Sequence, residues 1–129
     1  MKKALLFIAI VSSLAACKKE KTTTNANVFG KWELRAIQGS LPTPLLKNPG
    51  NGDIYRFNSD STYVRYIDNK VQSQGKFSIK ITEVRDTIKF GSINLTNPAY
   101  QDAWSQTPNT IAIGTSALDG PTYIYRRIN

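Results

Sequence analysis

An alternation of apolar and polar residues with a period of two recurs from residue 28 to the end of the chain, and it most constrains the fold. No stretch there shows the apolar spacing of three and four residues by which a helix buries one face. The clearest alternation runs over residues 76–81, where aromatic or aliphatic residues follow lysine or serine. Because successive side chains of a strand point to opposite faces, this pattern predicts strands with one buried and one wet face.

Eight short segments carry this alternation or are rich in β-branched and aromatic residues. We predict strands at residues 32–36, 55–57, 62–67, 77–81, 88–90, 93–95, 111–113 and 123–128. Turn-forming residues separate most of them, and Gly91 is expected to divide the fifth strand from the sixth. Two connections are long, at residues 39–52 and 96–109, and the second is expected to hold one helical turn rather than a strand.

These segments predict an all-β fold, an antiparallel meander of about eight strands that closes into a barrel. Closure removes the exposed sheet edges at which chains would otherwise pair. The side chains expected in the interior are mostly large: Trp32, Leu34, Tyr55, Phe57, Val64, Tyr66, Phe77, Ile79, Ile88, Phe90, Ile111, Tyr123 and Tyr125. A register shift of one residue in the second and third strands would instead turn Tyr63 and Arg65 inward.

The first 16 residues have the composition of a secretory signal peptide. Two lysines precede a run of uncharged residues that is too short for the ~20-residue helix that spans a bilayer. The run ends in Leu14-Ala15-Ala16-Cys17, which resembles the lipobox of bacterial lipoproteins. The resemblance implies that residues 1–16 are removed and that the thiol of Cys17 carries the lipid. The alternative is an ordinary signal peptide followed by a coincidental cysteine.

Residues 22–27 are polar and of low complexity, which is typical of a linker. We expect residues 17–27 to form a flexible tether that reaches at most ~35–40 Å. The residue after Cys17 is Lys18. In Gram-negative lipoproteins of the kind that the lipobox resembles, an aspartate at this position retains the protein at the inner membrane. The resemblance therefore implies a lipid-anchored protein of the outer membrane in a Gram-negative cell envelope, on its periplasmic or its outer face. The charged run at residues 18–21 is either a surface-export signal or a plain solvated tether.

Charge and composition exclude several classes of function. The chain has 17 basic and 9 acidic residues, a net charge of +8, but residues 28–129 carry 12 and 8, which leaves +4. No arginine-rich stripe with interleaved aromatic residues is present, so we expect no nucleic-acid partner. The chain has no histidine and one cysteine, which excludes Ser-His-Asp and Cys-His catalysis, histidine-ligated metals and an internal disulfide. We expect no enzyme, no metal and no cofactor.

Four short motifs follow one another along residues 28–129. They are Gly30-Lys31-Trp32, then Tyr55-Arg56-Phe57 with Asp60 and Thr62-Tyr63, then Gly75-Lys76-Phe77-Ser78-Ile79, then Tyr123-Ile124-Tyr125-Arg126. In this order they resemble the Gly-x-Trp signature and later strands of small lipocalin-like bacterial lipoproteins. The resemblance implies a lipocalin-like β-barrel whose base, near Gly30, is closed by an arginine over the Trp32 indole. Arg126 and Arg127 are the candidates for that arginine.

The barrel interior is expected to be either open at one end or filled by its own side chains. An open mouth would bind a small, partly apolar or amphipathic ligand through a set of aromatic residues, Tyr55, Phe57, Tyr66, Phe77, Phe90, Tyr123 and Tyr125. A filled barrel would be a non-enzymatic interaction module that contacts an envelope protein or glycan. Its contact residues would be Tyr100 and Trp104 in the long connection, unless that connection folds back and buries Trp104.

Two tripeptides fit a short bacterial O-glycosylation sequon. They are Asp60-Ser61-Thr62 and Asp86-Thr87-Ile88, which make Ser61 and Thr87 candidate acceptors at turn-to-strand junctions.

Overall fold

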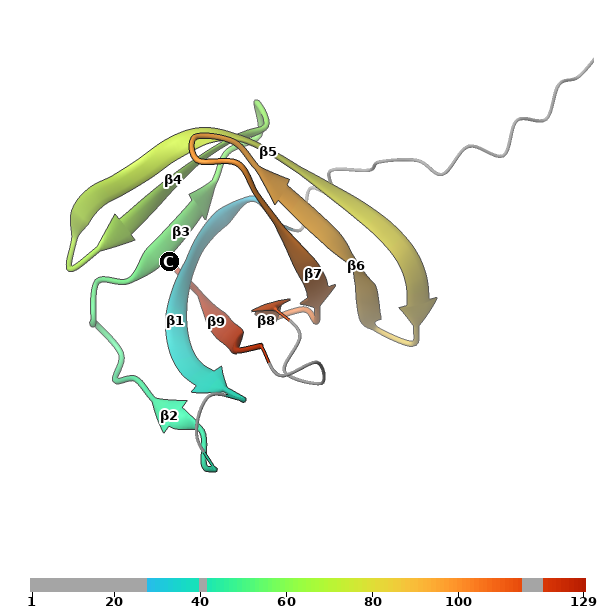
Figure 1. The fold of residues 1–129 in the computed structure, drawn as a ribbon, viewed down its shortest axis with the longest axis horizontal. Helices are drawn as coiled ribbons and strands as arrows, with labels where there is room; N and C mark the ends of the chain where they lie inside the picture. Colours follow the sequence, from blue (N-terminus) through green and yellow to red (C-terminus); the bar gives the residue numbers. More distant parts are fainter. Residues whose placement is uncertain (1–27, 40–41, 115–119) are drawn as a thin grey trace, which may run out of the picture.

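The computed structural model describes residues 28–39, 42–114 and 120–129. The expected signal peptide and tether, with Cys17, lie outside the described residues. Nine strands and no α-helix occur in the described part (Figure 1). The strands are β1 (Gly30–Gln38), β2 (Leu45–Leu46), β3 (Ile54–Phe57), β4 (Thr62–Ile67), β5 (Lys70–Arg85), β6 (Ile88–Leu95), β7 (Tyr100–Gln106), β8 (Thr110–Gly114) and β9 (Thr122–Ile128).

All strand pairs are antiparallel, and the sheet closes on itself. The hydrogen-bonded order is β2-β1-β3-β4-β5-β6-β7-β8-β9, and β9 also pairs with β1, from Lys31 opposite Ile128 to Gln38 opposite Thr122. Strand β1 and strands β3 to β9 therefore form a closed eight-stranded barrel, which confirms the predicted fold. The two-residue strand β2 is an addition beside the far end of β1, apart from the barrel wall (Figure 1).

The expected turn at Gly91 is wrong, because this glycine lies inside the continuous strand β6. A Cβ atom there would lie only 1.8 Å from the carbonyl oxygen of Lys80 in β5. Here glycine permits close contact between two strand backbones, next to the irregular register between Ile81 and Glu83.

The expected helical turn in residues 96–109 is also wrong, because this segment contains β7. The strand pairs with β6 over its whole length, from Tyr100 opposite Leu95 to Gln106 opposite Lys89. Its alternation is hard to recognise because one of its two buried residues is polar: Trp104 is accompanied by Gln106. One predicted strand is lost by fusion in β6 and one is gained in β7, so the barrel still has eight strands.

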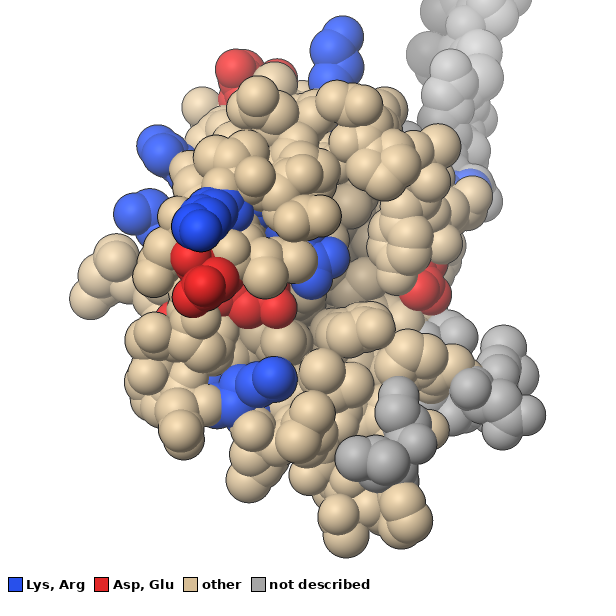
Figure 2. Space-filling model, turned by 60° about the vertical axis from the view of Figure 1, so that its left-hand side comes forward, with Lys and Arg blue, Asp and Glu red and all other residues tan. Residues whose placement is uncertain are grey.

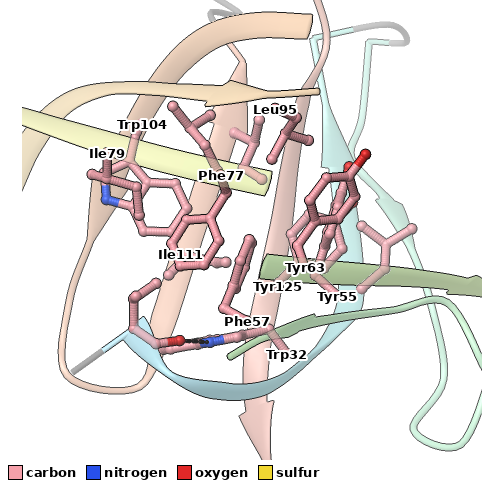
Figure 3. Close-up of a cluster of buried hydrophobic side chains, with 14 residues drawn as sticks. Trp32, Tyr55, Phe57, Tyr63, Phe77, Ile79, Leu95, Trp104, Ile111 and Tyr125 are labelled. Carbon is pink, nitrogen blue, oxygen red and sulfur yellow. Dashed lines mark hydrogen bonds between the residues drawn. The ribbon is translucent and has the colours of Figure 1, made fainter. Parts of the chain in front are cut away.

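Aromatic rings fill the barrel around Phe57. The centre of this ring lies 4.8 Å from that of Phe77 and 6.2 Å from that of Trp104. Figure 3 shows Phe57 and Phe77 between Trp104 on one side and a group of tyrosines on the other. This packing buries large apolar surface and fixes the rings in edge-to-face and tilted pairs.

Most of the predicted interior residues belong to this core. Trp32, Leu34, Tyr55, Phe57, Phe77, Ile79, Ile111 and Tyr125 are buried, and Tyr123 packs against them. The prediction is wrong for Val64, Tyr66, Ile88 and Phe90, which are only partly buried and outside the core cluster. In β4 the alternative register holds, since Tyr63 is buried and its neighbours Val64 and Tyr66 are not.

The base of the barrel is closed by Trp32 and Arg127. The indole is fully buried, and its Nε1–H donates to the carbonyl oxygen of Val28 at 2.8 Å. The guanidinium carbon of Arg127 lies 4.2 Å from the ring centre, and Nη1 donates to the carbonyl oxygen of Phe29 at 2.9 Å. Gly30 has a φ of +123° beneath this arginine, a backbone conformation that favours glycine. Of the two candidate arginines, the structure selects Arg127.

Candidate functional site

The end of the barrel opposite Trp32 holds a cavity of about 360 Å³, within the ~300–1,000 Å³ range of small-molecule sites. Strand β9 shows the arrangement, since Arg127 closes the base while Tyr125 and Tyr123 line the cavity. The lining residues are largely aromatic and aliphatic: Tyr55, Tyr63, Arg65, Ile67, Gln72, Ser73, Leu95, Pro98, Tyr100, Ile113, Tyr123 and Tyr125. Five of them are tyrosines, so the wall combines apolar ring faces with hydroxyl groups.

Three tyrosines form the floor of the cavity. The ring of Tyr55 lies 5.3 Å from that of Tyr125 in an edge-on pair and 6.1 Å from that of Tyr63. Burial raises the pKa of Tyr55 and raises that of Tyr125 well above its ordinary value, so both hydroxyls stay protonated at neutral pH. The hydroxyl of Tyr63 donates to the carbonyl oxygen of Thr96 at 2.7 Å and is already occupied.

Arg65 is the one charged side chain among the lining residues. Its guanidinium lies 5.0 Å from the ring centre of Tyr55, and Nη1 donates to the hydroxyl of Tyr55 at 3.2 Å. Nη2 is 3.5 Å from Oδ1 of Asp53, the residue before β3. Burial alone would lower the pKa of Arg65, but the oxygens of Tyr125, Tyr55 and Asp53 outweigh it, so the pKa is raised and the charge is permanent.

A β-bulge in β5 lies opposite Arg65 at the cavity wall. Arg65 lies opposite Ser73 and Tyr66 opposite Val71, so Gln72 is an extra residue in β5. Both Gln72 and Ser73 line the cavity as a result. Bulges are common at barrel rims and next to binding sites, where they redirect side chains.

The rim of the cavity carries Tyr100 and Ile67. Tyr100 is 38% exposed and its hydroxyl donates to Oδ2 of Asp102 at 2.5 Å. Burial and this hydrogen bond raise the pKa of Tyr100. Pro98, which follows a cis peptide bond after Asn97, completes this side of the wall.

Of the predicted ligand-binding residues, the structure brings Tyr55, Tyr123 and Tyr125 to the cavity. Phe57 and Phe77 are buried in the core and do not line it.

The predictions for Tyr66 and Phe90 are wrong. Tyr63 points inward, and Tyr66 belongs to the opposite face of β4. Phe90 is adjacent to Gly91 and outside the core, and the Arg85 guanidinium lies 5.4 Å from its ring centre. For Arg65 and Tyr63, the sequence signal is the alternative register of β4, in which both residues point inward.

Trp104 is not a surface contact. It is 2% exposed and packs edge-on against Phe57 (Figure 3). The expectation that this segment buries Trp104 is therefore confirmed, although a strand does so rather than a folded-back loop. Its Nε1–H has no hydrogen-bond acceptor among the described residues.

The remaining candidates lie apart from the cavity. A second hollow of about 230 Å³ lies near the base, between Thr87, Gln106, Pro108 and Arg127. Thr87 is exposed in the β5–β6 turn, whereas Ser61 is partly buried, with a positive φ of 69°.

Other features of the described residues concern metals, membranes and charge. No three His, Cys, Asp or Glu side chains gather among them as a metal site. Within the same residues there is no helix of the length and hydropathy needed to cross a bilayer. On the face shown in Figure 2, basic side chains are interspersed with acidic ones rather than gathered into one patch.

No family model, no curated protein and no solved structure matches this chain.

Proposed function

We propose that the barrel is a carrier or sensor domain that binds a small, partly apolar ligand in the tyrosine-lined cavity. The observation that carries this proposal is the division of the interior. One end is filled by Trp32, Phe57, Phe77 and Trp104, whereas the other leaves about 360 Å³ beside five tyrosines. The interior of an eight-stranded barrel has room for its own side chains or for one small ligand. In this barrel, side chains fill one end of the interior and the other end is open.

The proposal includes the lipid anchor expected from the lipobox. A chain that is held through Cys17 by its acyl groups, with residues 17–27 as a tether, would keep the barrel at the surface of the outer membrane. There it would meet amphiphiles that are shed from or delivered to the membrane. The cavity suits such molecules because its ring faces are apolar and its hydroxyls and guanidinium are polar.

Native mass spectrometry tests this function directly. The chain from residue 18 onward retains every described residue and lacks only the expected signal peptide and Cys17. Purified from cell extract without detergent, it is expected to carry a discrete added mass that is lost on denaturation. A Tyr125→Trp variant, which fills the cavity floor, should lose the added mass, whereas Tyr66→Trp on the other face of β4 should keep it. An adduct retained by both variants would contradict binding in the cavity.

A second candidate, contact with an envelope protein or glycan, has support from β2 rather than from Trp104. Leu46 is 75% exposed on this two-residue strand beside β1, and its neighbour Leu45 is also exposed. Exposed leucines on a sheet edge are common at protein contacts. Cross-linking in intact cells through position 46 distinguishes this candidate, since ligand binding in the cavity does not involve β2.

A further inference from the structure

Some hydrogen-bond donors of the cavity wall have no acceptor among the described residues. A guanidinium has five N–H groups, yet the one hydrogen bond of Arg65 within the described residues goes to the hydroxyl of Tyr55. Its Nε–H is buried with no acceptor there. The hydroxyls of Tyr123 and Tyr125 make no hydrogen bond in the described part of the chain either, and no Asp or Glu lines the cavity. Among the side chains of the wall, the acceptors are therefore neutral ones, the tyrosine hydroxyls, the amide of Gln72 and the hydroxyl of Ser73, and none is anionic.

Asp53 does not supply that acceptor. Its Oδ1 lies 3.5 Å from Nη2 of Arg65, which is beyond the usual length of a charge-assisted hydrogen bond. The same oxygen has no hydrogen-bond partner among the described residues. Asp53 thus balances the charge of Arg65 from one side without satisfying its N–H groups. The Arg65 side chain remains 27% exposed and lines the cavity.

The tyrosine hydroxyls reinforce the donor character of the wall. Burial raises the pKa of both Tyr55 and Tyr125, so these hydroxyls keep their protons at neutral pH. A protonated phenol can donate to an anion, and a permanently charged guanidinium holds a carboxylate through two parallel N–H donors. Both kinds of group line the same cavity as the apolar side chains of Ile113 and Leu95.

From this arrangement we infer that the ligand is an amphipathic organic acid. Its carboxylate binds the guanidinium of Arg65, with the free hydroxyls of Tyr123 and Tyr125 as further donors, and its apolar part lies along the tyrosine rings. This inference rests on the proposed function, since it names the chemical class of the ligand for the same cavity. It also assigns Asp53 a role, because a carboxylate that enters must compete with Asp53 for Arg65.

The test compares three probes of equal chain length: octanoate, octanol and octylammonium. Isothermal titration calorimetry of the chain from residue 18, at low salt and about pH 7.5, keeps octanoate ionised. Octanoate is expected to bind about tenfold more tightly than octanol, as one charge-assisted hydrogen-bonded pair allows. Octylammonium is expected to bind more weakly than either.

Three single substitutions assign the effect to Arg65. Arg65→Gln should bring the affinities for octanoate and octanol within about twofold of each other, because the charged interaction is removed. Arg56→Gln is the matched control, since Arg56 is an exposed arginine on the outer face of β3, and it should leave the tenfold preference unchanged. Asp53→Asn retains Arg65 and removes its competitor, so it should strengthen octanoate binding roughly threefold.

The outcomes separate the inference from the function on which it rests. Equal binding of octanoate and octanol to the wild type would overturn the anionic ligand and leave cavity binding intact. Binding of neither probe would overturn both. If Arg65→Gln does not melt cooperatively, Asp53→Asn decides the matter, and unchanged or weaker octanoate binding in that variant overturns the inference.

Discussion

Two arginines stack on aromatic rings inside the barrel, and their surroundings differ. Arg127 lies 4.2 Å from the centre of the fully buried Trp32 ring and also bonds a backbone carbonyl. Arg65 lies 5.0 Å from the centre of Tyr55 and borders open space. Because Arg127 covers a fully buried indole and hydrogen-bonds a backbone carbonyl, we assign it to the stability of the base. Arg65 lines the larger cavity, where it would be available to a ligand.

At the base, replacement of Arg127 should destabilise the barrel more than replacement of its neighbour. Arg127→Gln removes the contact with Trp32 and the hydrogen bond to Phe29, so we expect a loss of about 1–2 kcal/mol in the free energy of unfolding. Arg126→Gln is the same substitution at an exposed side chain, and it should lower the free energy of unfolding by no more than ~0.5 kcal/mol. Urea denaturation measures both, and equal losses would show that the stacked pair does not close the base.

At the scale of single residues, the sequence predicts those parts of the site whose strands have a clear alternation. Tyr55 lies in such a strand, because Arg56 separates it from Phe57, and its predicted inward position is confirmed. Strand β4 reads Thr-Tyr-Val-Arg-Tyr-Ile, with large apolar residues on both faces, so alternation does not fix which face is inward. The bulge that brings Gln72 and Ser73 to the cavity leaves no distinctive residue pattern, and only the paired strands reveal it.

Among the elements, β6 and β7 show why strand boundaries are harder to predict than strand number. Gly91 inside β6 is a residue type typical of turns, but here it permits a close contact between two strand backbones. Strand β7 has the composition of a loop because Gln106, one of its inward residues, is polar, although it is buried. Pairing with neighbouring strands overrides the local preference in both cases.

The close contact at Gly91 predicts a large penalty for a single methyl group. In Gly91→Ala the new Cβ would overlap the carbonyl oxygen of Lys80, 1.8 Å away, so β5 and β6 must separate. We expect a loss of ~3 kcal/mol or more in the free energy of unfolding. Gly50→Ala is the control, because its φ of +83° is strained but its Cβ would meet nothing within 4 Å; it should cost ~1 kcal/mol. Denaturation curves with similar midpoints for the two variants would contradict a role in strand contact.

Considered as a whole, the molecule combines a filled core and an open cavity in one closed sheet. The chain begins the barrel at the base with β1 and returns there with β9, so the pairing of these two strands joins the ends of the domain. Closure leaves the barrel wall without free strand edges except near β2. The tyrosines that line the cavity therefore project from strands that are paired on both sides. A ligand that entered a preformed cavity of this kind would bind without a large ordering cost, because the side chains of the wall are already fixed by packing.

The buried tyrosines give the whole barrel a characteristic response to alkaline pH. Tyr55 and Tyr125 have pKa values raised by burial above the ordinary value of 10.0, so the folded state holds their protons more tightly than the unfolded state. The sign follows from linkage: stability from this source is complete below about pH 10 and is lost as pH rises through the folded-state pKa. We expect the free energy of unfolding to decline above about pH 10.

A matched pair of variants isolates the contribution of a buried tyrosine hydroxyl to the loss of stability at alkaline pH. Tyr125→Phe removes one buried hydroxyl from the floor of the cavity, so the decline of stability between about pH 10 and pH 11 should be shallower than in the wild type. Tyr66→Phe, on the other face of β4 and outside the core, should follow the wild-type curve. Urea denaturation at each pH, with tyrosinate absorbance recorded in parallel, gives both quantities. The proposed ligand site needs the same hydroxyls protonated, so octanoate binding should weaken over the same pH range. Octanoate binding that stays unchanged above that range would exclude the tyrosine hydroxyls as donors to the carboxylate.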